Sequence, residues 1–471
     1  MGADWLRSQT ELERATEVTA LVIAWSAVEP HRVGEVALIA DDAPDQMLGR
    51  GEVADSPVDR LAFHRQRPGS LVACPPIQGP AISQEQVLLR PAPGGLQIER
   101  VGRCGVLLSG SSVDQGLLRP GDTLSLKHQL VLYCTRRTAQ LPALRSYPAG
   151  ELHRFGEPDP HGMVGESATA WELRDQLAFA AHSDRHALLV GESGSGKELA
   201  AQALHALSRR GERPLVARNA ATFPTGIIDA ELFGNVKDYP NAGMDARPGL
   251  IGEADGSTLF LDEIAELPME LQAHLLRVLD AKGEYQRLGD AQMRRADLRI
   301  VAATNRALAE LKQDLLARLT LRVEVPGLPC RRDDVPLLVR HMLKQAAAES
   351  PDVGERFFGE VAGAGPHARI EPSLVDLLVR HRYTHHAREL EGLLWEAIAH
   401  SPGKFIALTE GVADKIEVEP AAAEPVAELS PEEIRACLER HDGKVSRAWR
   451  ELGLNSRYAL YRLIKKYGLD Q

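Results

Sequence analysis

Short apolar runs separated by clusters of glycine, proline and aspartate fill residues 15–136. The runs read ALVIAW, VALIA, VLLRP, LQIERV, GVLLSG and LVLYC, and no helical period of similar length competes with them. Apolar runs this short, bounded by turn residues, are typical of β-strands. The pattern therefore predicts an all-β sandwich over residues 15–136.

After residue 160 the pattern changes to strands that alternate with longer helical segments. ALLV, STLFL, LRIVAAT and LRVEVP read as strands, and KELAAQALHALSRR reads as a helix. This alternation favours an α/β fold with a parallel sheet over residues 161–345. Residues 346–417 read as a smaller α-helical lid, and residues 137–160 and 418–429, rich in proline and charge, are predicted to be linkers.

Residues 430–471 are predicted to form an all-α helix-turn-helix. Ser430, Pro431 and Glu433 stand in the order of a capped helix start. Gly453 suits the tight turn between the last two helices, and the apolar residues around it have helical spacing.

Charge separates this last segment from the rest of the chain. The 471 residues carry a formal net charge of −11, which excludes general coating of nucleic acid or of an anionic membrane. Residues 443–467, in contrast, hold seven cations and one acid, a local charge of +6. Such a patch is typical of phosphate contact with DNA, and the alternative is a basic helical hairpin that faces solvent. The predicted DNA-binding residues are Asn455, Ser456, Arg457, Tyr458, Arg462 and Lys465.

The five cysteines are scattered and form no CxxC pair. They support neither a disulfide framework nor a zinc site, and they fit a reducing compartment. The first residues lack the apolar core of a signal peptide, and no run approaches the roughly 20 apolar residues of a membrane span. We expect a cytoplasmic protein without a membrane partner.

A glycine-rich loop, GESGSGKE, follows the predicted strand ALLV and opens a helix. In that context the backbone N–H groups and the helix N-terminus cradle phosphate, and the lysine adds a positive charge. The expected ligand is ATP, although Glu198 stands where a magnesium-binding Ser or Thr is usual. The alternative is a plain glycine-rich turn. The predicted ATP-binding residues of the loop are Gly191, Glu192, Ser193, Gly194, Ser195, Gly196, Lys197 and Glu198.

Two adjacent carboxylates end a second apolar strand, in GSTLFLDEI. Asp262 is predicted to hold Mg²⁺, and Glu263 to orient the attacking water. Adjacent residues of a strand face opposite ways, so the chain must turn at this point to bring both to one site. The alternative is a solvated helix cap.

Residues 161–400 resemble the AAA+ domain of bacterial enhancer-binding proteins, ATPases that remodel sigma-54 RNA polymerase. GESGSGKE, ELFG and ADGSTLFLDEI carry the resemblance, and in this family a glutamate after the lysine is normal. The resemblance implies a ring, usually a hexamer. Residues 443–469 are similar to the Fis-type helix-turn-helix that ends these proteins.

The same resemblance implies roles for residues outside the two motifs. Asn219 would restrain the catalytic glutamate, and Asn305 would be sensor I. Arg318 would act on the γ-phosphate of a neighbouring subunit, while Lys312 occupies the position of a second such arginine. Arg388 would be sensor II, although the usual Trp-Pro-Gly-Asn before it has become Tyr383-Thr384-His385-His386. Because Lys312 cannot form the bidentate fork of the arginine that it replaces, a reduced rate of ATP hydrolysis is expected.

The loop after ELFG departs from the family. Its Gly-Ala-Phe-Thr-Gly-Ala hexapeptide, which touches the sigma factor, is replaced here without a change of length by Asp238, Tyr239, Pro240, Asn241, Ala242 and Gly243. Proline fixes φ and removes an N–H donor, which predicts a stiffer and more acidic tip. Two interpretations stay open: an activator of sigma-54 RNA polymerase with a tolerant loop, or a nucleotide-dependent DNA-bound regulator or scaffold that does not activate it.

The N-terminal sandwich resembles a forkhead-associated (FHA) domain, which binds phosphothreonine. LGRG places Arg50, and AISQEQV places Ser83, at the family's phosphate contacts. The family's Arg and His after the serine are lost, and Cys104 stands where an asparagine is usual. The resemblance implies a phosphothreonine protein as partner, and the alternative is a sandwich kept for packing or for protein contact without phosphate.

Overall fold

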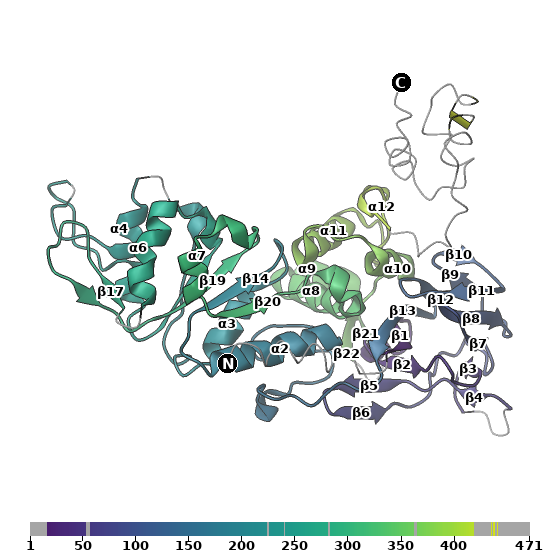
Figure 1. Cartoon of the computed structure of the whole chain (residues 1–471). Helices are drawn as coiled ribbons and strands as arrows, with labels where there is room; N and C mark the ends of the chain where they lie inside the picture. The colour runs from purple at the N-terminus through teal and green to yellow at the C-terminus, as the bar shows by residue number, and fades with distance from the viewer. Residues whose placement is uncertain are drawn as a thin grey trace. The chain divides into compact units, whose positions relative to one another are not determined.

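The structure is a computed structural model that describes residues 17–52, 57–223, 226–239, 241–280, 283–361 and 365–418, and positions 435, 437, 438 and 440. It divides into two units, residues 1–417 and residues 418–471. The predicted helix-turn-helix and its DNA-binding residues lie outside the described residues, apart from those four positions. The first unit is described below (Figure 1).

The N-terminal part of the first unit is a sandwich of two sheets, as the pattern of short apolar runs predicted. The eight-stranded sheet has the order β10-β9-β12-β13-β1-β2-β5-β6, and the five-stranded sheet has the order β11-β8-β7-β3-β4. Every named pair is antiparallel except β3 with β4. The strands are β1 (Glu17–Ser26), β2 (Val36–Ile39), β3 (Gln46–Leu48), β4 (Asp59–Arg60), β5 (His64–Arg67), β6 (Ser70–Ala73), β7 (Val87–Ala92), β8 (Gly95–Arg100), β9 (Val106–Leu108), β10 (Ser111–Ser112), β11 (Gln115–Leu118), β12 (Thr123–Leu126) and β13 (Leu130–Thr138).

The middle of the chain forms an α/β core around a parallel five-stranded sheet of order β15-β16-β19-β14-β20. Its strands are β14 (Ala187–Val190), β15 (Val216–Asn219), β16 (Thr258–Asp262), β19 (Arg299–Thr304) and β20 (Leu321–Glu324). The helices are α2 (Ala168–Ala181), α3 (Lys197–Ala206), α4 (Ile228–Phe233), α5 (Gly249–Glu253), α6 (Met269–Leu279) and α7 (Gln313–Arg318). α2 and α3 pack on one face of the sheet, and α4 to α7 pack on the other (Figure 1). A small hairpin, β17 (Glu284–Tyr285) and β18 (Arg294–Arg295), extends the second side.

The helical region that follows begins earlier than the predicted lid. α8 (Val335–Glu349) runs across residue 345, and it is followed by α9 (Pro351–Phe357), α10 (Pro372–Arg380), α11 (His386–His400) and α12 (Glu410–Lys415). A hairpin of β21 (Phe358–Val361) and β22 (Gly365–Ala368) interrupts the helices. Pro336 lies in the first turn of α8, where its missing N–H costs no helical hydrogen bond.

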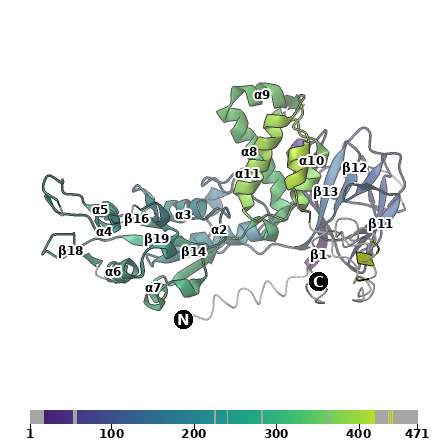
Figure 2. The same cartoon turned by 90° about the horizontal axis from the view of Figure 1, so that it is seen from above.

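The helical region also explains why β1 is buried along nearly its whole length. Leu21 and Ile23 belong to the core of the sandwich, whereas Ala24 belongs to an apolar cluster shared with α8, α10 and α11. Val131 and Tyr133 of β13 join that cluster, and α10 lies beside both strands (Figure 2). One face of the eight-stranded sheet therefore packs on the helical region instead of facing solvent.

Residues 137–160, predicted to be a linker, pack closely on α2. Leu141 and Tyr147 are buried in a small apolar cluster with Trp171 and Ala178. The side chain of Asp175 accepts hydrogen bonds from the backbone N–H groups of residues 145, 146 and 147, at 2.7–3.2 Å. The segment is a structured strap between the sandwich and the α/β core.

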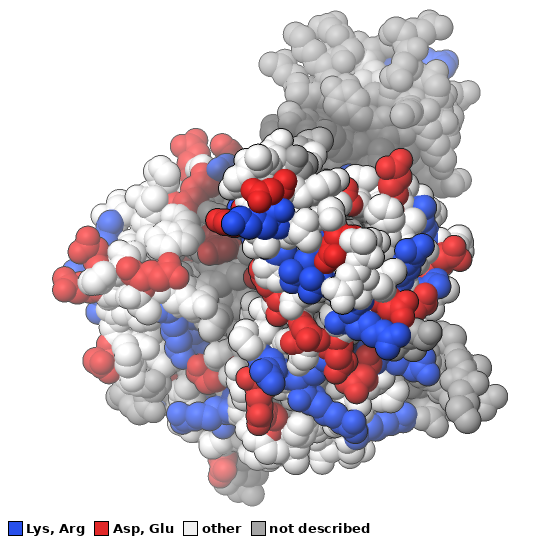
Figure 3. All heavy atoms as spheres, turned by 90° about the vertical axis from the view of Figure 1, so that its left-hand side faces the viewer, with Lys and Arg blue, Asp and Glu red and all other residues white. Residues whose placement is uncertain are grey.

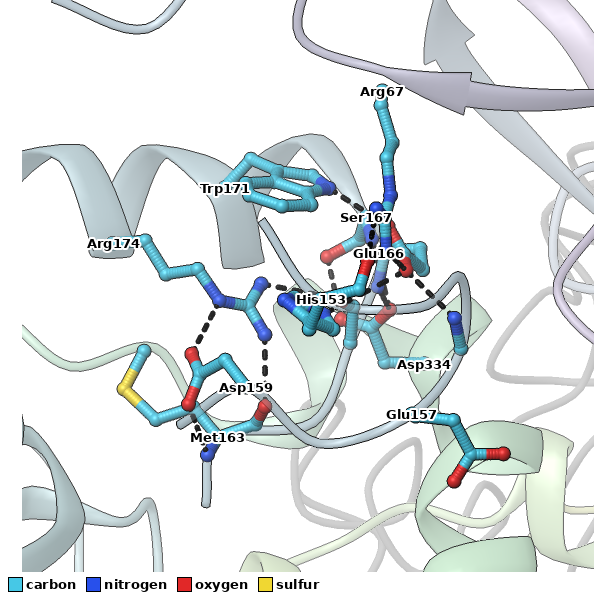
Figure 4. A network of polar contacts seen from close by, with 12 residues as sticks. Arg67, His153, Glu157, Asp159, Met163, Glu166, Ser167, Trp171, Arg174 and Asp334 are labelled. Atoms are coloured by element: carbon cyan, nitrogen blue, oxygen red, sulfur yellow. Dashed lines mark hydrogen bonds and ion pairs between the residues drawn. The ribbon is translucent and has the colours of Figure 1, made fainter. Parts of the chain in front are cut away.

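A buried carboxylate, Glu166, fastens the sandwich to the core (Figure 4). Arg67 of β5 forms a two-pronged ion pair with it, with Nε 3.0 Å from Oε2 and a terminal nitrogen 2.6 Å from Oε1. Trp171 Nε1 and the Gly156 N–H donate to the same carboxylate, at 3.0 and 2.7 Å. Only 2% of the Glu166 side chain is exposed, so these donors replace the water that it would otherwise bind.

The network continues into the helical region through Asp334. Its carboxylate accepts from the N–H groups of Glu166 and Ser167 at 2.7 and 2.9 Å, and from Ser167 Oγ at 2.6 Å. Arg137 of β13 pairs with Asp333 at 3.3 Å, and burial raises the pKa of Asp333 to about 6. The sandwich, the core and the helical region thus meet around one set of paired buried charges.

His153 of the strap is stacked on Trp171 with ring centroids 5.6 Å apart. Burial lowers the pKa of His153 to about 4, and nearby Arg174 adds to this. Arg174 in turn pairs with Asp159 at 2.7 Å, and both side chains are fully buried. The imidazole is therefore neutral near pH 7 and acts as an aromatic packing surface.

No helix among the residues that the structure describes is long and apolar enough to cross a membrane.

Candidate nucleotide-binding site

The phosphate loop connects β14 to α3, as the sequence pattern predicted. Gly194 and Gly196 have φ of +82° and +102°, a left-handed conformation that glycine adopts without steric cost. The loop therefore turns back on itself, and α3 begins at Lys197. The positive end of the helix dipole lies at this point.

Lys197 spans the loop from inside. Its Nζ donates to the carbonyl oxygens of Gly191 and Glu192, at 2.9 and 3.1 Å, and lies 3.9 Å from Glu263 Oε1. Burial lowers the pKa of Lys197, while the nearby Glu263 and Asp262 carboxylates oppose that shift. The lysine charge is held where an anion in the loop would meet it.

Asp262 and Glu263 both reach this region because the chain turns sharply at the end of β16. Glu263 has φ +50°, in the left-handed region that non-glycine residues seldom adopt. Glu263 Oε2 accepts from the backbone N–H of Asn305 at 3.3 Å. Asn219 Nδ2 lies 3.4 Å from Asp262 Oδ2, so the asparagine expected to restrain Glu263 contacts the neighbouring carboxylate instead.

The start of α11 lies against the tip of the phosphate loop. Arg388 donates to Ser193 Oγ at 3.0 Å, and the Ala387 N–H donates to the Gly194 carbonyl at 3.2 Å. Glu192 Oε2 accepts from His386 Nε2 at 2.9 Å. Arg388 therefore contacts the phosphate loop, and its role as sensor II stays a prediction.

His386 and Arg331 are contacts of the loop that sequence reasoning missed. Arg331 donates to the Ser195 carbonyl at 3.3 Å, and burial lowers its pKa. The departure of Tyr383-Thr384-His385-His386 from the family pattern was a signal for His386. No comparable signal marked Arg331, which follows Cys330 in a stretch that reads as an ordinary helix start.

Arg318 does not join the residues around Lys197 within one chain. Its Nε donates to Asp280 Oδ1 at 2.8 Å, and about a third of its side chain is exposed. The backbone N–H of Lys312 donates to Gln272 Oε1 at 3.2 Å, at the start of α7. An action of Arg318 on a nucleotide would have to take place in another subunit.

Comparison with known proteins identifies the family. Residues 163–326 match the model of the sigma-54 interaction domain. The transcriptional regulatory protein ZraR of Salmonella typhimurium is 36% identical over 314 residues, which cover 64% of this chain and 68% of ZraR. The chain belongs to the family of sigma-54-dependent transcriptional regulators.

Two further proteins are similar to this chain over a comparable share of its length. The DNA-binding transcriptional regulator NtrC of Azospirillum brasilense is 37% identical over 302 residues, 62% of this chain and 60% of NtrC. A crystal structure of NtrX from Brucella abortus in complex with ATP is 29% identical, with a TM-score of 0.46, and the match covers 65% of this chain and 69% of NtrX. The sigma-54 interaction domain is an AAA+ ATPase domain, and the regulators that carry it act on sigma-54 RNA polymerase.

In this sigma-54-dependent regulator the loop expected to touch the sigma factor is a closely bonded turn. Asn235 is fully buried, and its Nδ2 donates to the carbonyls of Val236, Tyr239 and Asp245 at 2.9–3.2 Å. Asp238 has φ +63°, and its Oδ1 accepts from the Gly243 N–H at 2.7 Å.

Tyr239 closes the loop against the β17–β18 hairpin. A Cβ placed on Gly289 would lie 2.6 Å from Tyr239 Cγ, so the ring rests directly on the glycine backbone. Pro240 lies outside the described residues. On the side of the molecule that carries α4 and β17, the described basic and acidic side chains are interspersed (Figure 3).

The predicted phosphate contacts of the sandwich lie together at the ends of its strands. The backbone N–H of Arg50 donates to the Ser83 carbonyl at 3.0 Å, and Ser83 Oγ accepts from the Arg103 N–H at 3.1 Å. Buried Gln86 holds the two loops, because its Oε1 accepts from the N–H groups of Ser83 and Cys104 at 3.2 Å each. Gln86 is thus a structural residue of these two loops.

Proposed function

We propose that this regulator hydrolyses ATP at the loop around Lys197. The observation that carries the proposal is the meeting of Lys197, Glu263 and Arg388 at one loop, from three distant parts of the chain. Lys197 would bind the β- and γ-phosphates, and Arg388, which belongs to the lid, would also bind phosphate. Glu263 would orient the attacking water, and Asn305 would hold Glu263 through the backbone contact described above.

Asp262 fits a magnesium ion that is bound mainly through phosphate and water. Its Oδ1 accepts the Glu263 N–H at 3.0 Å, and a carboxylate oxygen has room for a further partner. No cluster of three or more His, Cys, Asp or Glu suited to a metal ion occurs in the described part of the chain. One carboxylate plus substrate oxygens is the usual arrangement for Mg²⁺, which would neutralise charge on the β- and γ-oxygens.

Arg318 would complete the site of the neighbouring subunit in a ring, usually a hexamer in this family. Its partner Asp280 is more than half exposed, and a surface ion pair of this kind is weak enough to be exchanged for a phosphate contact. Glu263, Asp262 and Arg318 are thus the proposed catalytic residues, and Asn219 would position the Asp262 carboxylate that it contacts. Lys312, in place of a second arginine, would lower the rate.

The ends of the chain would connect this ATPase to its signals. We propose that residues 430–471 bind DNA through the residues from Asn455 to Lys465. The FHA-like sandwich would bind a phosphothreonine protein at Arg50 and Ser83, where the exposed Arg103 adds positive charge. In that arrangement the sandwich acts as the sensor, and sigma-54 RNA polymerase is the target.

The rate of ATP turnover against protein concentration, with and without sigma-54 RNA polymerase, tests this proposal. We expect turnover per subunit to rise with concentration and then to saturate, because Arg318 must come from a neighbour. An Arg318→Ala variant should lose about 10³-fold or more of the rate, by analogy with other trans-acting arginines. An arginine that acts only within its own chain would leave turnover per subunit independent of concentration, and that result would contradict the ring.

A second function, regulation without activation of sigma-54 RNA polymerase, is favoured by the bonded loop at residues 238–243. Asn235 and Asp238 make hydrogen bonds within the loop and Tyr239 packs on Gly289. The loop also lacks the Phe-Thr tip of the family.

Grafting Gly-Ala-Phe-Thr-Gly-Ala onto positions 238–243 separates the two functions. If the native loop does not engage the sigma factor, sigma-54-dependent transcription in vitro should appear only in the grafted protein, while ATP turnover stays within a few-fold. The control is a second graft with Phe replaced by Ala. Transcription driven by the native loop would refute this second function.

A further inference from the structure

His386 connects the lid to the phosphate loop. Its Nε2 donates to Glu192 Oε2 at 2.9 Å. The next two lid residues contact the next two loop residues: Ala387 bonds to Gly194 through the backbone, and Arg388 to Ser193. Residues 192–194 therefore contact the lid, and the same residues belong to the loop that would surround phosphate.

The surroundings of His386 are built for this ring. Its φ of +51° is a left-handed conformation, in which histidine and asparagine are among the few residues tolerated. Only 2% of the residue is exposed, and a Cβ on Gly327 would lie 2.4 Å from its Cε1. Glycine at position 327 thus leaves the space that the imidazole fills.

The carboxylate partner and the burial of His386 favour a role of this residue beyond packing. A carboxylate oxygen accepts hydrogen bonds, so Nε2 is the donor in this contact. Within the described residues the other ring nitrogen, Nδ1, is buried and has no hydrogen-bond partner. Among the described residues the imidazole therefore makes one side-chain hydrogen bond. Its acceptor, the Glu192 carboxylate, belongs to a side chain that is 75% exposed.

We propose that His386 is a positioning residue for nucleotide binding: its hydrogen bond to Glu192 holds the first turn of α11 so that Arg388 stays at the phosphate loop. This inference rests on the proposed function, since it assumes that nucleotide binds there. His386 itself touches no phosphate in this role. Its effect on ATP passes through Arg388.

Affinity for a fluorescent ATP analogue, measured on the full-length chain, tests the proposal. We expect His386→Ala to weaken binding about tenfold, because a hydrogen bond to a charged group is lost. In an Arg388→Ala background the same change should have almost no effect, because the two residues act as one unit. His386→Asn, which tolerates the positive φ and can donate to Glu192, should restore most of the affinity.

Two further variants keep the test decisive. Glu192→Ala removes the same contact from the exposed side and should reproduce the loss without disturbing the lid interior. His400→Ala, an exposed histidine at the other end of α11, should bind like the native chain. Equal affinity of Glu192→Ala and the native chain, or additive losses at His386 and Arg388, would overturn the proposal. A native chain that binds no analogue would instead refute nucleotide binding itself, and the role of His386 with it.

Discussion

Replacing Glu263 by alanine is expected to lower the kcat of ATP hydrolysis by about 10²–10⁴-fold, the usual contribution of a positioned general base. The carboxylate lies 3.9 Å from Lys197 Nζ and accepts a hydrogen bond from the Asn305 N–H, and alanine at this position offers no group that could orient the attacking water. Nucleotide affinity should stay the same or increase, because a negative charge beside the phosphates is removed. Turnover and binding of the same purified variant give the two numbers.

The matched control is Glu270→Gln, an exposed carboxylate in the first turn of α6, which should leave both numbers unchanged. If Glu263→Ala retains turnover within tenfold of the native chain, Glu263 does not activate water. If it loses nucleotide affinity as well, its role is to hold Lys197 in place.

The phosphate loop could be predicted because its determinants are contiguous. Strand, glycine-rich loop and helix start follow one another within about twenty residues, and the left-handed glycines and Lys197 are set by local sequence. The turn that brings Asp262 and Glu263 to one site was also expected from the strand end. Its left-handed φ at Glu263, however, is a property of the folded backbone.

The contacts of the lid could not be predicted, because they join residues far apart in sequence. Glu192 and His386 are separated by 194 positions, and no period or spacing connects them. The resemblance to the family motif marked position 386 as unusual but could not supply its partner. The same holds for Arg331 and Ser195.

Composition was misleading for residues 137–160. Proline and charge are typical of linkers, but here the partners that order the segment lie on α2. Trp171 and Ala178 bury the apolar residues of the segment, and Asp175 accepts hydrogen bonds from its backbone N–H groups. Whether a charged segment is a linker depends on these partners, which its own residues do not reveal.

Replacing Glu166 by alanine is expected to lower the free energy of unfolding by about 3–5 kcal/mol, the usual cost of removing one partner of a buried ion pair. Arg67, Trp171 and the Gly156 N–H would each lose their acceptor at once. Urea denaturation followed by tryptophan fluorescence measures the loss, since Trp171 lies at the site. A double variant, Arg67→Met with Glu166→Leu, should recover part of the lost stability, because it removes both charges from the interior. Trp171 Nε1 and the Gly156 N–H stay without this acceptor, so the recovery is incomplete.

The control lies in the same network. Glu157 pairs with Lys344 at 2.9 Å, but both side chains are 38% exposed, so Glu157→Ala should cost about 0–1 kcal/mol. Equal costs at positions 157 and 166 would mean that solvent reaches Glu166 and that the sandwich is only loosely attached. A large cost at Glu166 alone would mean that the sandwich, the strap and the core unfold as one structure.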